Sequence, residues 1–132
     1  MYTEILDFTE SKDQPLIYKI EIGNPSDNFY RFYVGKSSRG HKRPLKKYLK
    51  CVKNFENNKY RKIYRNKEIV GTRPAWRDNV HPHLSEAIKN KWPIKLTMQP
   101  SSLQNLDFDE KTILHENIQN HGKERTLNIK LV

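Results

Sequence analysis

The sequence predicts a small domain of the α/β (α+β) class, in which helices flank a three-stranded antiparallel sheet. Three segments, 16–22, 29–34 and 94–98, have the alternation or the β-branched and aromatic content of strands. Apolar residues at helical spacing lie between and after these segments. A chain of 132 residues has room for one domain with a modest core. We therefore expect a lead-in at 1–15 and one domain at 16–132.

The first two strands are expected to form a hairpin. Residues 16–22 alternate apolar and polar side chains, and turn-forming residues at 23–28 follow. The second strand, 29–34, ends at Gly35, where a polar loop rich in Lys, Arg and Ser begins. Such a hairpin would present Tyr18 and Tyr33 beside a basic loop.

Helices are predicted after the hairpin and on either side of the third strand. Pro44 suits the first turn of a helix that ends at Asn57-Asn58, and Pro82 starts a shorter one that Trp92-Pro93 breaks. Pro100-Ser101-Ser102 is a start signal for the last helix. The residues expected on the buried stripes of the first two helices are Leu45, Tyr48, Leu49, Val52, Phe55, Leu84, Ala87 and Ile88.

A basic insertion is expected at about 59–80. Tyr60–Ile69 fits a helix or an extended segment, 71–74 predicts a turn, and 76–79 predicts a loop. Trp76 would either stack on a base or cap the core, and the second role is the commoner one for a tryptophan.

Charge is the strongest compositional signal. The net charge is +10, and residues 31–73 hold fifteen Lys or Arg against only two acidic residues, Glu56 and Glu68. A basic band interleaved with aromatic residues is typical of a protein that binds a phosphate backbone, whereas a solvated helix face is the alternative. The residues expected to contact nucleic acid are Lys46, Lys47, Lys50, Arg73, Trp76 and Arg77.

Other features narrow the class of protein. No run of about 18 apolar residues exists, so no membrane span is expected, and the acidic N-terminus does not resemble a signal peptide. The single cysteine, Cys51, excludes an internal disulfide, fits a reducing cytoplasm and is assigned to the core. His81 and His83 flank a proline, which is poor geometry for a shared metal, so we expect them at a helix start or on the surface.

Glu110 is the main candidate for a metal ligand. It falls in the middle of the stripe that Leu103, Leu106, Ile113 and Leu114 form on the last helix. A carboxylate there is costly to bury unless it is paired, hydrogen-bonded or bound to a metal. Alternatively, Asp107 starts a shorter helix and Glu110 completes a capping box. Glu116 is expected to face solvent and is the second candidate for the metal.

Five landmarks occur in a characteristic order. They are Leu16-Ile17-Tyr18, Tyr33-Val34-Gly35, Arg43 eight residues after that glycine, Glu110, and Leu127-Asn128-Ile129. This order resembles that of the GIY-YIG nuclease superfamily over residues 16–130. The first motif here lacks its glycine, Pro44 directly follows Arg43, and the insertion is additional. Arg39 is the alternative to Arg43.

The resemblance implies a divalent-metal-dependent DNA endonuclease. Glu110 would hold one Mg²⁺ (or Mn²⁺), and Arg43 would contact the scissile phosphate. Tyr18 would help to deprotonate the attacking water, with Tyr33 and Lys36 close by and Asn128 bracing the site. Nearby cations would have to lower the pKa of a tyrosine base from about 10. For both tyrosines, simple packing on the sheet is the alternative.

The implied partner is DNA, expected to be double-stranded, and a homodimer or a protein partner is left open. A catalytically inactive nucleic-acid-binding module on the same scaffold is the second interpretation. A basic protein that binds RNA or another protein is the third, and it would need none of the five landmarks.

Overall fold

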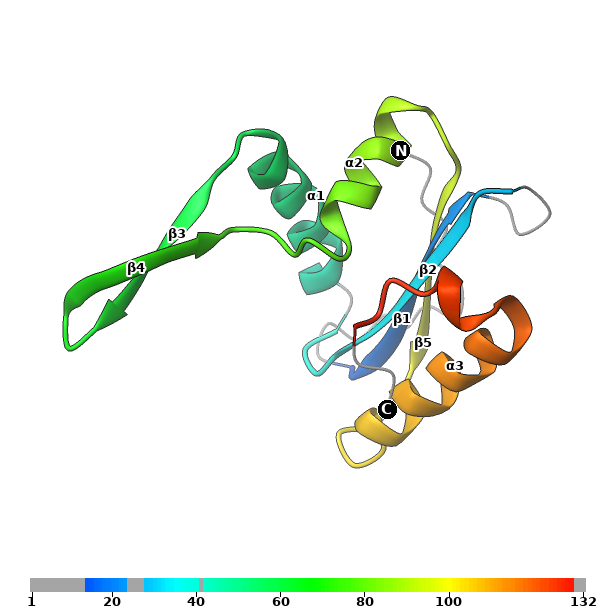
Figure 1. Ribbon diagram of the computed structural model, residues 1–132. Coiled ribbons are helices and arrows are strands. Elements are labelled where there is room, and N and C mark those ends of the chain that lie inside the picture. The colour runs from blue at the N-terminus through cyan, green and yellow to red at the C-terminus, as the bar shows by residue number, and fades with distance from the viewer. Residues whose placement is uncertain (1–13, 24–27, 41, 130–132) are drawn as a thin grey trace.

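The computed structural model describes residues 14–23, 28–40 and 42–129, apart from the side chains of 42–46. Its elements follow one another along the chain as Figure 1 shows. They are β1 (Leu16–Gly23), β2 (Tyr30–Ser37), α1 (Lys42–Glu56), β3 (Tyr60–Arg65), β4 (Glu68–Pro74), α2 (His81–Lys89), β5 (Ile94–Pro100), α3 (Leu106–His121) and the 3₁₀ turn η1 (Lys123–Arg125).

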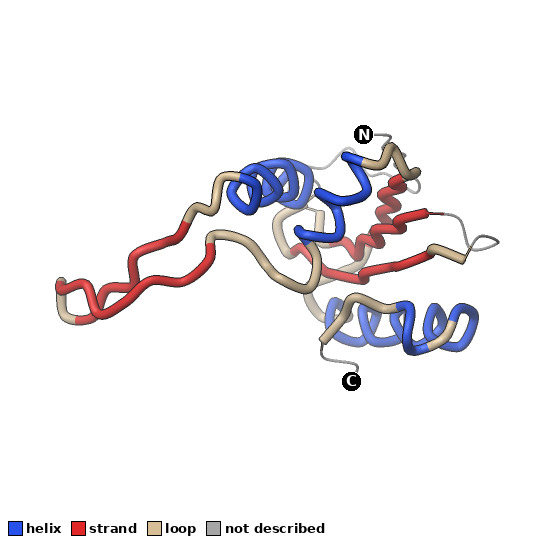
Figure 2. Tube along the Cα trace, turned by 45° about the horizontal axis from the view of Figure 1, so that its top comes forward, coloured by secondary structure: helices blue, strands red, loops and turns tan. Residues whose placement is uncertain are grey.

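The main sheet has the strand order β2-β1-β5, and both pairs of strands are antiparallel. Helices α1 and α2 lie over one face and α3 over the other (Figures 1 and 2). The predicted three-stranded antiparallel sheet flanked by helices is therefore confirmed. Within the described residues, no helix is long and apolar enough to cross a membrane.

The core is divided between the two faces of this sheet. Alternate residues of β1 point to opposite faces, so Ile20 and Ile22 pack toward α1 and α2 while Ile17 packs toward α3. On β2, Tyr33 joins the first cluster, and Phe32 and Val34 join the second. Because of this alternation, neighbouring side chains of β2 reach opposite faces of the sheet.

The last helix begins later than the sequence suggested. Strand β5 continues to Pro100, residues 101–105 form a connection, and Asn105 occupies the N-cap position of α3. Asp107 therefore lies within the first turn of the helix, so the alternative in which it starts a capping box with Glu110 is wrong. Leu103 precedes the helix and is 73% exposed, so it is not part of the buried stripe.

Two predicted core residues on the other helices are exposed instead. Leu49 of α1 and Ile88 of α2 lie on the solvent side of their helices. The stripe that each helix buries is therefore narrower than the sequence pattern suggested. Among the described apolar side chains of these helices, the buried ones are Cys51 and Val52 of α1 and Leu84 and Ala87 of α2. The assignment of Cys51 to the core is confirmed.

The insertion is a two-stranded ribbon formed by β3 and β4. The turn predicted at 71–74 is wrong, because those residues belong to β4 and pair with β3. The chain reverses at Asn66 and Lys67, whose φ angles of 51° and 67° are both positive, as a two-residue type I′ turn requires. The ribbon extends away from the rest of the domain (Figures 1 and 2).

Gly35 has a specific packing role in the sheet. It lies directly opposite Tyr18 on the neighbouring strand, and a Cβ atom at this position would overlap the tyrosine ring. The glycine therefore leaves the space that the Tyr18 ring occupies. The requirement comes from packing, and not from an unusual backbone angle.

We expect Gly35→Ala to lower the free energy of unfolding by about 1–3 kcal/mol, because overpacking displaces the Tyr18 ring. Urea denaturation would measure the change. Gly71→Ala is a suitable control, since Gly71 also lies in a strand but has open space where its Cβ would be. Equal stability of the two variants would show that the Tyr18 ring yields without cost.

Candidate functional site

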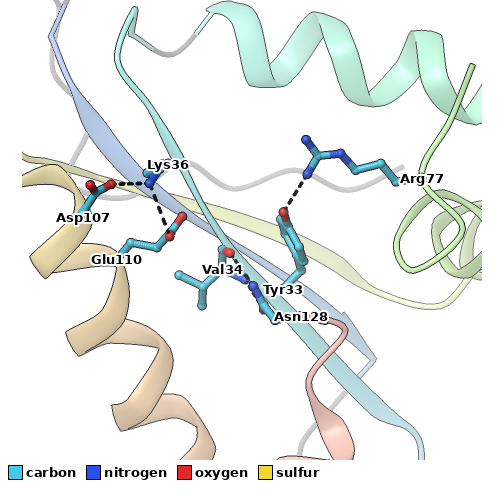
Figure 3. A network of polar contacts seen from close by, with 7 residues as sticks. All are labelled: Tyr33, Val34, Lys36, Arg77, Asp107, Glu110 and Asn128. Atoms are coloured by element: carbon cyan, nitrogen blue, oxygen red, sulfur yellow. Dashed lines mark hydrogen bonds and ion pairs between the residues drawn. The ribbon is translucent and has the colours of Figure 1, made fainter. Parts of the chain in front are cut away.

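The candidate site straddles the edge strand β2. Tyr33 points to the face covered by α1 and α2, whereas Val34 and Lys36 point to the α3 face. Figure 3 shows the strand passing between Tyr33 and Arg77 on one side and Lys36, Asp107 and Glu110 on the other. The site therefore has two halves, one on each side of a single strand.

Arg77 defines the first half. Its Nη1 donates a hydrogen bond of 3.1 Å to the hydroxyl oxygen of Tyr33, which leaves the Tyr33 proton available to a different acceptor (Figure 3). The predicted loop at 76–79 is confirmed, and it brings this guanidinium to the sheet edge. Arg77 was expected to contact nucleic acid, but its place beside Tyr33 was not foreseen.

Tyr18 belongs to a cluster of three tyrosines. Its ring centroid lies 6.3 Å from that of Tyr33 and 5.8 Å from that of Tyr48. Burial, together with Tyr33, raises the pKa of Tyr18 to about 12, although a hydrogen bond from Tyr48 and the charge of Arg77 act in the opposite direction. The lowered pKa that a tyrosine base would need is therefore not found at Tyr18, because desolvation outweighs the nearby positive charge. Tyr18 is therefore a phenol at neutral pH.

His81, at the start of α2, is buried beneath this cluster. Its Nδ1 accepts a hydrogen bond of 2.8 Å from the backbone N–H of Arg77, so the proton of the neutral ring is on Nε2. Nε2 has no hydrogen-bonding partner among the described residues. His81 also lines a cavity of about 50 Å³, together with Tyr18, Tyr33 and Arg77. His81 is thus placed at the helix start, as expected, but it is not a surface residue.

The second half of the site is built on α3. Lys36 forms an ion pair with Asp107, and its Nζ lies 3.9 Å from Oε1 of Glu110 (Figure 3). Burial raises the pKa of Glu110 while the charge of Lys36 opposes the shift, whereas the hydrogen bond from Lys36 lowers the pKa of Asp107. Glu110 is half-buried, and Glu116 is exposed, as predicted for the latter.

Asn128 holds the C-terminal segment against the open edge of β2. Its Oδ1 accepts a hydrogen bond of 3.0 Å from the backbone N–H of Val34, and its Nδ2 donates one of 2.8 Å to the Val34 carbonyl (Figure 3). Leu127 adds a backbone hydrogen bond of 2.7 Å to the carbonyl of Phe32. The side-chain amide of Asn128 thus pairs with β2 as a neighbouring strand would.

One open groove joins the two halves. Its volume is about 530 Å³, and Tyr33, Arg77, Glu110 and Asn128 all line it. The groove places a guanidinium, a phenol hydroxyl and a half-buried carboxylate around a space large enough for a phosphodiester. Three of these four residues were predicted for the catalytic site from the sequence.

The other predicted residues have varied positions. Lys47 and Lys50 are exposed on α1, and Lys47 also lines the tyrosine cavity. The side chains of Arg43 and Lys46 lie outside the described residues. Trp76 donates a hydrogen bond to Asp78 and packs edge-on against Phe55 and Tyr60, which is the packing role that the sequence left open.

Sequence reasoning missed the pairing of Arg77 with His81. The two residues are four positions apart, at the entry to a helix that Pro82 starts. Residues four positions apart are close in space when the residues between them form a turn. The spacing of Arg77 and His81 was therefore the signal in the sequence that could have indicated their contact. The role of Arg77 depends on Tyr33, which is 44 positions away in the chain.

A divalent ion is compatible with the α3 half of the site. Among the described residues, no group of three or more His, Cys, Asp or Glu side chains converges. Mg²⁺, however, commonly uses one or two carboxylates and keeps several waters. Glu110 lines an open groove, and Asp107 lies one turn away on the same helix, so these carboxylates fit such an ion. Lys36 contacts both carboxylates and would compete with the ion for them.

Comparison with known proteins adds no assignment: no family model, no curated protein and no solved structure matches this chain.

His81 should make stability depend on pH. Burial, with the charges of Arg77 and Lys47, lowers the pKa of His81 to about 4 from 6.5. Between these two pKa values, His81 is protonated in the unfolded chain but neutral in the folded chain. The free energy of unfolding therefore falls as the pH drops from 6.5 toward 4. The loss attributable to this residue is up to about 3 kcal/mol.

Denaturant titrations at several pH values would measure this loss. In His81→Asn, the side-chain oxygen replaces the Nδ1 acceptor and cannot titrate, so the fall in stability should be shallower than in the parent protein. His83→Asn, at a more accessible position on the same helix, is the control. Identical slopes in His81→Asn and the parent would contradict the prediction.

Proposed function

We propose that this protein is a divalent-metal-dependent DNA endonuclease with a site like that of the GIY-YIG nucleases. The observation that carries the proposal is the convergence of Tyr33, Arg77, Glu110 and Asn128 on one groove at the edge of a three-stranded antiparallel sheet. The landmarks of the sequence and the net charge of +10 support the same class of substrate.

Arg77 is the residue that would bind the scissile phosphate. A guanidinium presents several N–H donors in a fixed plane that matches phosphate oxygens. Its hydrogen bond to Tyr33 orients it toward the groove, and it has no ion-pair partner among the described residues. It would therefore stabilise the negative charge that develops on the phosphate during hydrolysis. Arg43 stays a prediction for the same role.

The aromatic residues would supply protonated donors. Tyr18 keeps its proton at neutral pH because burial raises its pKa to about 12. His81 and Tyr18 line the same cavity, and the N–H at Nε2 of His81 lacks a partner among the described residues. Both groups are thus suited to donate hydrogen bonds, and neither is suited to remove a proton from water in this arrangement.

Glu110, with Asp107 one turn away, would hold the metal. A bound divalent ion would supply Lewis-acid stabilisation of the phosphoryl oxygens and lower the pKa of a coordinated water. Glu110 contributes a carboxylate whose desolvation makes an added positive charge favourable. Lys36, which contacts both carboxylates, would have to move aside or turn to the phosphate.

A catalytically inactive nucleic-acid-binding module is the second candidate. The observation that favours it is the position of Lys36, which already neutralises Asp107 and Glu110. In that case Arg77 and the cations beside it, Lys47, Arg61 and Arg73, would bind a phosphate backbone without cutting it.

Incubation of the purified protein with supercoiled plasmid, with and without Mg²⁺, would separate the two functions. Nicked or linear DNA that appears only with the metal supports the nuclease. Retarded but intact plasmid under both conditions supports the binding module, and the absence of both effects contradicts both.

A further inference from the structure

The β3–β4 ribbon carries like charges where a sheet usually avoids them. Arg61 and Arg73 lie directly opposite each other across the two strands. Like charges at such positions destabilise a strand pair. Among the described residues, neither guanidinium has an ion-pair or hydrogen-bonding partner. A bound polyanion would neutralise both guanidinium groups and so remove the repulsion between them.

Both faces of the ribbon are open to a ligand. Every residue of β3 is exposed, as are all residues of β4 except the half-buried Gly71 and Pro74. Exposed residues of the ribbon include five cations, Arg61, Lys62, Arg65, Lys67 and Arg73, against the single acid Glu68. Large apolar side chains are exposed as well, and Tyr64 is 62% exposed. A two-stranded hairpin is marginally stable by itself, so a bound partner would stabilise it.

The base of the ribbon is continuous with the candidate site. A groove of about 380 Å³ is lined both by Arg61 and Arg73 of the ribbon and by Lys47, Arg77 and His81 of the domain. Arg77 also lines the groove that holds Tyr33 and Glu110. A phosphate backbone that follows the arginines of the ribbon is therefore led to Arg77.

The position of the ribbon base is fixed by hydrogen bonds. The Ala75 N–H donates to the Lys59 carbonyl over 3.0 Å, and the Asn54 side chain donates to the Ala75 carbonyl over 3.1 Å. Trp76 packs beside these bonds against Tyr60. The ribbon thus has a defined direction relative to Arg77, which follows Trp76 directly in the chain.

We infer that the β3–β4 ribbon inserts into the major groove of duplex DNA and positions the duplex for cleavage. A two-stranded ribbon fits that groove, which is about 12 Å wide, and touches its walls on both faces. The six residues of β3 span about 20 Å, enough to reach across the groove. Arg61 and Arg73 then contact the phosphates that border the groove next to the cleaved bond. This inference rests on the proposed function for its cleavage step, but the binding step stands alone.

Binding without metal tests the ribbon independently of cleavage. We would measure the affinity of the Arg61→Gln/Arg73→Gln variant for a short labelled duplex in chelator, between about 50 and 200 mM salt. The loss of two phosphate contacts should lower the slope of log affinity against log salt by about two units. The matched control is Lys89→Gln/Lys91→Gln, which removes the same charge from exposed positions at the last residue of α2 and in the turn that follows it.

Insertion into the major groove of DNA is tested with duplexes whose cytosines carry a bulky C5 substituent, because that substituent lies in the major groove. The parent protein should bind them more weakly than plain duplex. A variant in which Asn-Gly joins Tyr60 to Pro74 lacks the ribbon but keeps these two residues, which pair where the ribbon leaves the domain. This variant should bind both duplexes with equal affinity.

Three results would overturn the inference. The first is a salt slope for the arginine variant equal to that of the lysine control. The second is equal affinity of the parent protein for plain and substituted duplex. The third is a change of oligomeric state, with unchanged DNA affinity, when the ribbon is removed, which would make the exposed apolar residues a self-association surface. A parent that binds as expected but never cuts plasmid would contradict the proposed function alone.

Discussion

Glu110→Gln is expected to reduce DNA cleavage by at least about 100-fold while DNA binding persists. The substitution removes the charge that would hold the divalent ion but nearly preserves the shape of the side chain. Loss of about 2.7 kcal/mol of transition-state stabilisation gives this factor. Binding should persist or tighten, because a negative charge beside the phosphates is removed.

Folding of Glu110→Gln should not suffer. Burial raises the pKa of Glu110, so the folded state disfavours its ionised form, and an uncharged amide avoids that cost. Asp107 would still pair with Lys36. The free energy of unfolding at neutral pH should therefore stay equal or rise slightly, which chemical denaturation can measure.

Glu116→Gln is the matched control for this experiment. Glu116 is exposed on the same helix, and its substitution should leave cleavage and binding within a factor of about two. Full cleavage by Glu110→Gln together with loss in Glu116→Gln would move the metal site along α3. Full cleavage by both variants would remove α3 from the mechanism.

Arg77→Ala should reduce the single-turnover rate of cleavage by about 10²–10³-fold at saturating DNA, because it removes a positioned donor to the developing charge. Arg77→Lys should recover only part of the rate, since an ammonium lacks the planar fork of a guanidinium. The hydrogen bond to the Tyr33 hydroxyl would also be lost in Arg77→Ala, so the tyrosine would no longer be oriented by the loop.

Two further variants make this result specific. Arg125→Ala removes a guanidinium near Tyr30, at the other end of β2, and should leave the rate within a few-fold of the parent. Arg43→Ala tests the position that the sequence motif indicated. A large loss in Arg43→Ala with little loss in Arg77→Ala would return the phosphate-binding role to Arg43.

The sheet could be predicted from the sequence because its pattern is local. Alternation in 16–22 and 94–98 gave two strands whose buried residues, such as Ile20 and Leu96, match the expected face. The ribbon could not be predicted in the same way. Gly71 and Pro74 suggested a turn, whereas the true turn at Asn66-Lys67 contains neither glycine nor proline.

The candidate site was predictable in part. Tyr33, Glu110 and Asn128 are recognisable by motif or by position on a helix, and all three line the same groove. The place of Arg77 beside Tyr33 depends on the packing of the loop before α2, which no local pattern encodes. The direction of the Tyr18 pKa shift depends on how much water burial removes, and a count of nearby cations does not capture that quantity.

Under the proposed function, the position of the candidate site on the edge strand β2 would limit how a duplex is cut. Arg77 approaches from one side of a single strand and Glu110 from the other, so each chain would place one such pair of groups around one phosphodiester. One encounter between a monomer and DNA would therefore break one backbone. In a plasmid time course, nicked circles would accumulate before linear molecules, and the lag between them would shorten with protein concentration if two chains act together.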